Sequence, residues 1–186
     1  MMTPRLLGLL AMAAASLFST TLEKLALDDM ILKSTEIVRG RVSSVSSLRR
    51  GALILTQVRV SVLERWKGPE ASTVDVYLHG GTFQGLRQTF SGTPDLLEGS
   101  EYVLFLWAGK SGNRQIIGLS QGVLDIQTTL SKSGAPGAGV TLMAHRSAIA
   151  GMVDAATLEE TPDSGLTIPL EQLRARVQRA LSGEKQ

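Results

Sequence analysis

The sequence contains no cysteine, which excludes disulfide bonds, thiolate zinc sites, a catalytic thiol and a lipid-modified N-terminal cysteine. Aromatic residues make up only 4% of the 186 residues, and the net charge is only +2. The basic residues do not gather into a stripe interleaved with aromatic side chains. Because a nucleic-acid-binding surface needs both features, the sequence predicts no nucleic acid as a partner.

Apolar residues are abundant: 43% of the chain is hydrophobic and 19% is charged. This balance supports a real core and argues against wholesale disorder. The chain also has 19 glycines among short runs rich in valine, leucine and isoleucine. Such a composition is typical of a turn-rich β protein, and the length fits one domain with appendages.

Residues 1–20 have the pattern of a secretory signal peptide. Arg5 supplies a positive n-region, and residues 6–18 form an apolar run followed by small residues. The run is shorter than the ~20 residues that span a bilayer, and no second run is long enough. We expect an exported protein, periplasmic or extracellular, with no stable membrane insertion after signal cleavage. An uncleaved N-terminal anchor is the alternative.

Alternating apolar and polar residues predict strands over 35–45, 52–68 and 72–78. Residues 101–107 form a nearly continuous apolar run, which is typical of a strand buried on both faces. Gly40 inside the first of these segments indicates a bulge or a close backbone approach.

Helical patterns stand at both ends of the mature chain. Residues 22–34 predict a short helix with Asp28 as its N-cap. Residues 166–186 predict an amphipathic helix that packs on the strands through a stripe made of Leu170, Leu173, Val177 and Leu181. Between them, residues 127–165 predict a flexible or partly ordered excursion, with 142–165 loose or partly helical.

These elements predict a mainly β protein, with a β-barrel domain over residues 21–126. The expected architecture is a small closed or partly open β-barrel of OB-like type. A short N-terminal helix and a C-terminal amphipathic helix accompany it. No pattern recurs at a fixed period, so no repeat architecture is expected.

The stretch GLSQG, residues 118–122, fits the G-x-S-x-G pattern of hydrolase nucleophiles. A nucleophile elbow needs a helix after the serine, whereas VLDI follows here and has strand character. The only downstream histidine is His145, and Asp125 is the one acidic residue available to complete a triad. We therefore interpret the motif as a glycine-flanked bend between strands. A serine hydrolase using Ser120 and His145 stays open as the alternative.

Other candidate residues point to binding rather than catalysis. His79, Gly80 and Gly81 form a loop whose backbone and imidazole could contact a ligand, or a plain turn. Trp66 at a strand end could anchor a partner, or plug the mouth of the barrel. The two histidines lie far apart with no carboxylate at ligand spacing, so neither a metal site nor a cofactor is predicted.

The order of motifs KSTEIVRGRVSSV, TQVRVSVLERWKG, GTPDLLEGSEYVLFLW and GLSQGVLDI resembles a group of uncharacterised exported bacterial proteins. The shared pattern is S-x-x-I-V-x-G-x-V, a strand ending in K-G, a G-x-P and Y-x-L-F-L hairpin, and G-x-x-Q-G. The layout is also loosely similar to the OB-type barrel of tissue inhibitors of metalloproteases and netrin modules. Those inhibitors chelate zinc through an N-terminal cysteine, so only the barrel shape and a bias toward protein binding carry over.

Taken together, the residues favour an exported, non-catalytic binding or interaction module whose partner is another exported or envelope protein. Catalysis near neutral pH usually needs ionisable groups that converge, whereas here they are scattered along the chain. An inhibitor or partner of an exported protease is a second alternative.

Overall fold

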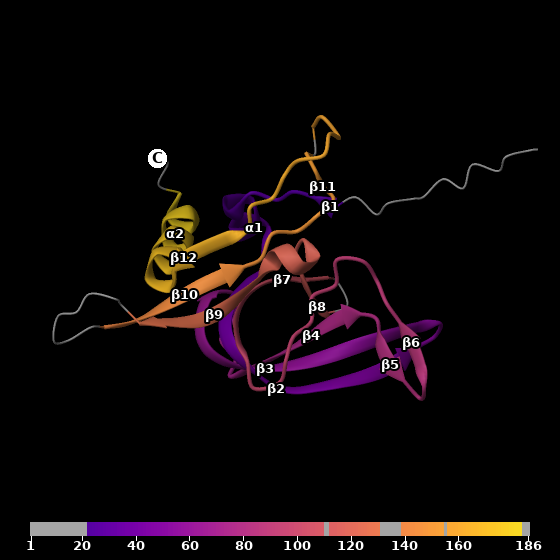
Figure 1. Cartoon of the computed structure of the whole chain (residues 1–186). Coiled ribbons are helices and arrows are strands. Elements are labelled where there is room, and N and C mark those ends of the chain that lie inside the picture. Colours follow the sequence, from indigo (N-terminus) through magenta and orange to yellow (C-terminus); the bar gives the residue numbers. More distant parts are fainter. Residues whose placement is uncertain (1–21, 110–111, 131–138, 155, 184–186) are drawn as a thin grey trace, which may run out of the picture.

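The computed structural model describes residues 22–109, 112–130, 139–154 and 156–183, so the predicted signal peptide at 1–20 lies outside the described residues. The protein is mainly β, with a large eight-stranded sheet and two α-helices in the described part (Figure 1). The strands are β1 (Leu22–Glu23), β2 (Glu36–Arg50), β3 (Leu53–Lys67), β4 (Thr73–His79), β5 (Gly81–Phe83), β6 (Leu86–Gln88), β7 (Glu101–Ala108), β8 (Arg114–Ile116), β9 (Val123–Leu130), β10 (Val140–Arg146), β11 (Met152–Val153) and β12 (Leu166–Pro169). The helices are α1 (Leu27–Lys33) and α2 (Leu170–Ser182).

The large sheet has the strand order β12-β10-β9-β7-β2-β3-β4-β8. Strand β8 pairs with β7 as well as with β4, so β7 has three strand neighbours. All pairings in this sheet are antiparallel except that of β4 with β8, which is parallel and joins only Val76 and Arg114. The β5–β6 hairpin forms a small sheet of its own, at the end of the molecule away from α2 (Figure 1).

The bulge predicted at Gly40 is confirmed. The register between β2 and β3 shifts between Arg39 and Gly40. A Cβ atom at Gly40 would lie 2.5 Å from Val60 Cγ1 and 2.7 Å from the Ser61 carbonyl oxygen, so no side chain fits there. The glycine therefore lets the two longest strands approach closely where the sheet bends.

Two apolar cores lie on opposite faces of β7, whose residues from Tyr102 to Leu106 are all buried. This confirms the strand buried on both faces that the apolar run predicts. The first core lies within the curve of the strands and contains Val38, Val42, Val58, Val60, Val74, Val76, Leu78, Leu96, Tyr102, Leu104, Leu106, Ile116 and Val123. The second core lies beneath the helices and contains Met30, Ile31, Ile37, Val103, Phe105, Leu124, Ala144, Leu170, Leu173 and Val177.

Helix α2 packs on the second core through Leu170, Leu173 and Val177, whereas Leu181 at the end of the predicted stripe is 39% exposed. The helix starts later than residue 166, since residues 166–169 pair with β10 and form strand β12. Neither helix in the described part of the chain has the length and apolar character needed to cross a membrane.

Helix α1 does not begin as predicted, because its N-cap is Ala26 and no side chain caps it. Asp28 instead lies in the first turn, where its carboxylate accepts two hydrogen bonds from Arg176 of α2, at 2.8 and 3.0 Å. The Arg176 guanidinium lowers the pKa of Asp28. The ion pair joins the two helices at the surface.

The predicted excursion at 127–165 contains strands in its described part. The boundary expected at residue 126 falls inside β9, and β10 lies where the sequence pattern predicts loose or helical chain. Strand β10 pairs with β9 on one side and β12 on the other, so the sheet supplies the order that the local composition does not predict. Residues 131–138 and Ala155 lie outside the described residues.

One carboxylate is buried between two arginines. Glu36 Oε2 accepts a hydrogen bond from Arg65 Nη1 at 2.8 Å, and Glu36 Oε1 accepts one from Arg114 Nε at 2.6 Å. The Glu36 and Arg65 side chains are only 4% and 5% exposed. Desolvation of both charges makes this pair costly to break, since a lone buried charge would remain.

Candidate functional site

Ser120 lies in a 3-10 turn, Leu119–Gly122, between β8 and β9. Its backbone N–H donates a hydrogen bond to the Gly92 carbonyl oxygen at 3.0 Å. Gly118 precedes the turn with φ 62°, in the left-handed region that favours glycine. The chain then enters β9 and not the α-helix that a nucleophile elbow requires. The stretch is therefore a glycine-flanked bend, as its composition predicts.

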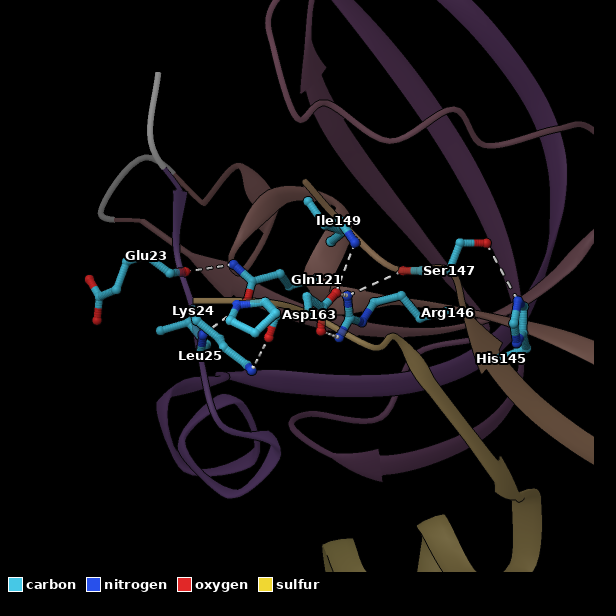
Figure 2. Close-up of polar contacts among 10 residues, drawn as sticks. Glu23, Lys24, Leu25, Gln121, His145, Arg146, Ser147, Ile149 and Asp163 are labelled. Atoms are coloured by element: carbon cyan, nitrogen blue, oxygen red, sulfur yellow. Dashed lines mark hydrogen bonds and ion pairs between the residues drawn. The ribbon is translucent and has the colours of Figure 1, made fainter. Parts of the chain in front are cut away.

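His145 lies on β10 and its imidazole is held by hydroxyl groups. Nδ1 is 2.9 Å from Thr167 Oγ1. Nε2 is 3.5 Å from Ser147 Oγ, a contact that Figure 2 shows. Within the described residues, no hydrogen bond joins His145 to Ser120. Asp125 is the cross-strand partner of His145, so the structure brings these two candidates together and leaves the serine out. Burial raises the pKa of Asp125, and the His145 charge opposes that shift.

The residue of GLSQG that makes specific contacts is Gln121, which sequence reasoning missed. Its side chain is buried, Oε1 accepts a hydrogen bond from the Leu25 N–H at 2.8 Å, and Nε2 donates one to the Glu23 carbonyl at 2.7 Å (Figure 2). The amide thus pairs with the backbone that joins β1 to α1. A glutamine one residue before Gly122 and the strand that follows is the only signal in the sequence, and it does not identify the partner.

A second polar contact ties the segment before β12 to β10. Arg146 donates two hydrogen bonds to the Asp163 carboxylate, at 2.6 and 3.0 Å, and the Ile149 N–H donates another at 2.9 Å (Figure 2). The Asp163 side chain is only 3% exposed. These hydrogen bonds lower the pKa of Asp163 from 3.8 to about 2. The contact is structural, because both Asp163 carboxylate oxygens are already paired with protein donors.

His79, Gly80 and Gly81 line a hollow of about 310 Å³ between the β5–β6 hairpin and the mouth of the first core. We call this site the His79 hollow. Its floor is apolar and comes from the first core, through Val58, Leu78 and Leu96. Its walls are polar and include Thr56, Arg87, Gln88, Thr93 and Asp95. This combination of an apolar floor with a few polar groups is typical of binding sites.

The two glycines have a structural reason to be glycine. Gly80 and Gly81 have φ values of 95° and 130°. A Cβ atom at Gly80 would lie 2.8 Å from the Gln88 carbonyl oxygen, and one at Gly81 would lie 2.5 Å from Thr56 Oγ1. The Gly80 N–H donates to the Ile54 carbonyl at 2.9 Å. The pair lets the chain reverse out of β4 and lay the hairpin against β3.

Some polar groups of the hollow have no partner within the described residues. The Thr93 hydroxyl oxygen is buried without a hydrogen bond. The His79 imidazole makes an edge contact with Phe90, with ring centroids 5.7 Å apart, and has no hydrogen bond there. Thr56 and Gln88, in contrast, bind the backbone of Gly80, Ile54 and Ala52. Thr93 and His79 are therefore among the polar groups of the hollow that have no partner in the described part of the chain.

Trp66 does not lie where the barrel-plug interpretation puts it. Its ring is half-buried against the second core, beneath the helices. Its indole Nε1–H donates to Glu64 Oε2 at 3.1 Å, and Glu64 also pairs with Arg39 of β2 and Arg174 of α2. Trp66 thus belongs to the contact between α2 and the sheet and is remote from the His79 hollow in the fold.

Metal ligation finds no support in the described part of the chain, which holds no group of three or more histidine, aspartate or glutamate side chains placed around one point. His79 ends β4 and His145 lies on β10, on the other side of β7 in the strand order.

No protein-family model matches this chain, and no curated protein matches it.

Proposed function

We propose that this protein is an exported, non-catalytic binding module built on an OB-type barrel, and that it takes up a protein partner at the His79 hollow. The observation that carries the proposal is the hollow itself. It combines an apolar floor, an imidazole and a buried hydroxyl without protein partners, and a loop that the sequence alone singles out.

The strand pairings support the barrel. Strands β2, β3, β4, β8 and β7 pair in that order, and β7 pairs back to β2, which makes a cycle of five strands. Five strands in a partly open Greek-key barrel are the arrangement of the OB fold. The single residue pair between β4 and β8 is the weak point of the cycle. The hollow lies beside this seam, because His79 follows Val76 on β4.

The exposed side chains around the hollow support a protein partner. Phe90 and Val45 both line the hollow, and they are 41% and 39% exposed. Aromatic anchors beside a pocket are common at the centres of protein interfaces. The signal-like residues 1–20 support a partner in the cell envelope or outside the cell.

The test is site-specific photo-crosslinking in the envelope of the native host. A benzoylphenylalanine residue replaces Phe90 in one variant and Leu181 in the control. The two positions are matched, since they are 41% and 39% exposed, but Leu181 lies on α2. We expect a discrete crosslinked protein from position 90 and none from position 181.

Equal crosslinking from both positions, or none from position 90, would contradict the proposal. The identity of the captured protein also decides between partners. An exported protease in the crosslinked band would favour the inhibitor interpretation over a general envelope partner.

A further inference from the structure

The end of the molecule around the His79 hollow carries arginines that no carboxylate neutralises. Among the described residues, Arg49, Arg50 and Arg87 form no ion pair, whereas most other arginines do. Residues 44–58 and 77–94, which build this end, contain no aspartate or glutamate. The charge is therefore a local excess and not part of a mixed surface.

The three arginines lie at the same end of the molecule as the hollow. Arg87 lines it directly. Arg49 lies on the same side of β2 as Val45, which also lines the hollow, because residues two and four apart on a strand share a face. The Arg50 guanidinium lies 5.9 Å from the ring centroid of Tyr77, two residues before His79 on β4.

The lining of the hollow offers little negative charge to neutralise these arginines. Asp95 is the one carboxylate among the lining residues, against three arginines at this end of the molecule. Unpaired arginines favour carboxylate or phosphate groups, which their planar guanidinium binds through two hydrogen bonds. An incoming anionic group thus gains contacts that the protein does not supply.

The apolar features decide which anion fits. Four large apolar side chains at this end are exposed: Val45, Leu53, Leu86 and Phe90. The hollow has an apolar floor, and at about 310 Å³ it lies at the small end of ligand pockets. It thus suits one or two side chains of a peptide. A phosphate chain has no apolar group to place on this floor, and a sugar chain has no projecting apolar side chain to insert into it.

Resting on the proposed function, we infer that the His79 hollow binds an acidic peptide segment of its partner. One large apolar side chain of the segment enters the hollow, and flanking carboxylates bind Arg49 and Arg87. The His79 imidazole is available to the peptide backbone.

The test pans a phage-displayed random hexapeptide library against the purified protein, the double variant R49Q/R87Q, and the control R179Q. Arg179 is a matched control, since it too forms no ion pair among the described residues but lies on α2. We expect peptides that combine Asp or Glu with Leu, Ile or Phe to be enriched on the wild-type protein and on R179Q, and lost on R49Q/R87Q.

The best enriched peptide is then measured by fluorescence anisotropy. We expect R49Q/R87Q to weaken binding about fivefold, as two exposed charge pairs allow, with no change in R179Q. Raising the salt from about 20 to about 150 mM should weaken binding to the wild-type protein more than to R49Q/R87Q. Urea midpoints of all variants check that each is folded.

Three results would overturn the inference: enrichment without acidic residues, no enrichment relative to R49Q/R87Q, or stronger binding of heparin fragments or phosphatidylglycerol vesicles than of any peptide. If crosslinking at position 90 succeeds in such a case, the binding module stands and only the acidic peptide fails. If crosslinking fails as well, the proposed function fails with it.

Discussion

The side-chain amide of Gln121 is hydrogen-bonded to the backbone of Leu25, a residue 96 positions earlier in the chain, with Oε1 2.8 Å from the Leu25 nitrogen. The same amide reaches the Glu23 carbonyl at 2.7 Å. Through Gln121, the turn before β9 therefore holds the backbone of residues 23–25 in place. Because Gln121 is 1% exposed, water can replace its hydrogen bonds only when this part of the fold opens.

Replacing Gln121 by methionine keeps the size of the side chain and removes both hydrogen bonds. We expect a loss of about 2 kcal/mol in the free energy of unfolding, since a buried partner group loses its hydrogen bond. Urea unfolding followed by circular dichroism measures this loss. Tryptic cleavage after Lys24 should also become faster.

The exposed Gln127→Met is the matched control and should change stability by less than about 0.5 kcal/mol. Equal effects of the two substitutions would show that the Gln121 contacts do not stabilise the fold.

Asp163 should make stability depend on acid pH. Its pKa is about 2 in the folded protein against an ordinary value of 3.8, so the unfolded chain takes up the proton first as the pH falls. The stabilisation is complete above the unfolded value and is lost as the pH falls through about 4 to about 2. Its size is about 2 kcal/mol, from the difference between the two pKa values.

In Asp163→Asn this part of the pH dependence should be absent, and stability at pH 7 should be lower by a similar amount. Unfolding in urea at a series of pH values measures both effects. Asp95→Asn removes an exposed carboxylate and serves as control. A pH profile of Asp163→Asn parallel to that of the wild-type protein would exclude this role.

Glu36 should be among the least replaceable polar residues. Glu36→Gln leaves the 5% exposed Arg65 guanidinium without its counter-charge, and we expect a loss of about 3 kcal/mol or more. The double variant E36M/R65M removes both charges and should be closer to the wild-type stability than Glu36→Gln. Thermal unfolding of the set tests this order, and Glu70→Gln at the exposed β3–β4 turn is the control. If the double variant is the least stable of the set, buried charge is not what makes Glu36 important.

Ser120 should not react as a catalytic serine. We expect no labelling by a fluorophosphonate probe, and no change on Ser120→Ala, because a strand follows the residue and no imidazole contacts it among the described residues. An active serine hydrolase in the same reaction checks the probe. Labelling that disappears in Ser120→Ala would establish the hydrolase alternative instead.

Local patterns predict much of the β framework. The alternation along β3, the bulge at Gly40 and the continuous apolar run of β7 each follow from the spacing of a few residues. The sequence pattern does not predict strand β10, because its buried face depends on the small Ala144 and on neighbours supplied by β9 and β12. Its order comes from tertiary pairing and not from its own pattern.

The site is less predictable than the fold. A glycine pair beside an imidazole singled out His79, Gly80 and Gly81 as candidates. The sequence does not show that Phe90 and Thr93 return to the same place, since a loop after β6 brings them there. The partners of Gln121 and Glu36 cannot be predicted from the sequence for the same reason. Contacts between residues far apart in the chain leave no periodic pattern in the sequence.

The alternation along β7 also limits how this molecule can vary. Val103 and Phe105 face one apolar layer while Leu104 and Leu106 face the other, on a single stretch of backbone. A change in size on either side moves main chain that both layers share. Helices α1 and α2, which cover the second core, are therefore a required part of the fold that evolution cannot remove without cost. A fragment truncated before α2 would present the underside of β7 to water, and we expect it to aggregate rather than persist as a smaller domain.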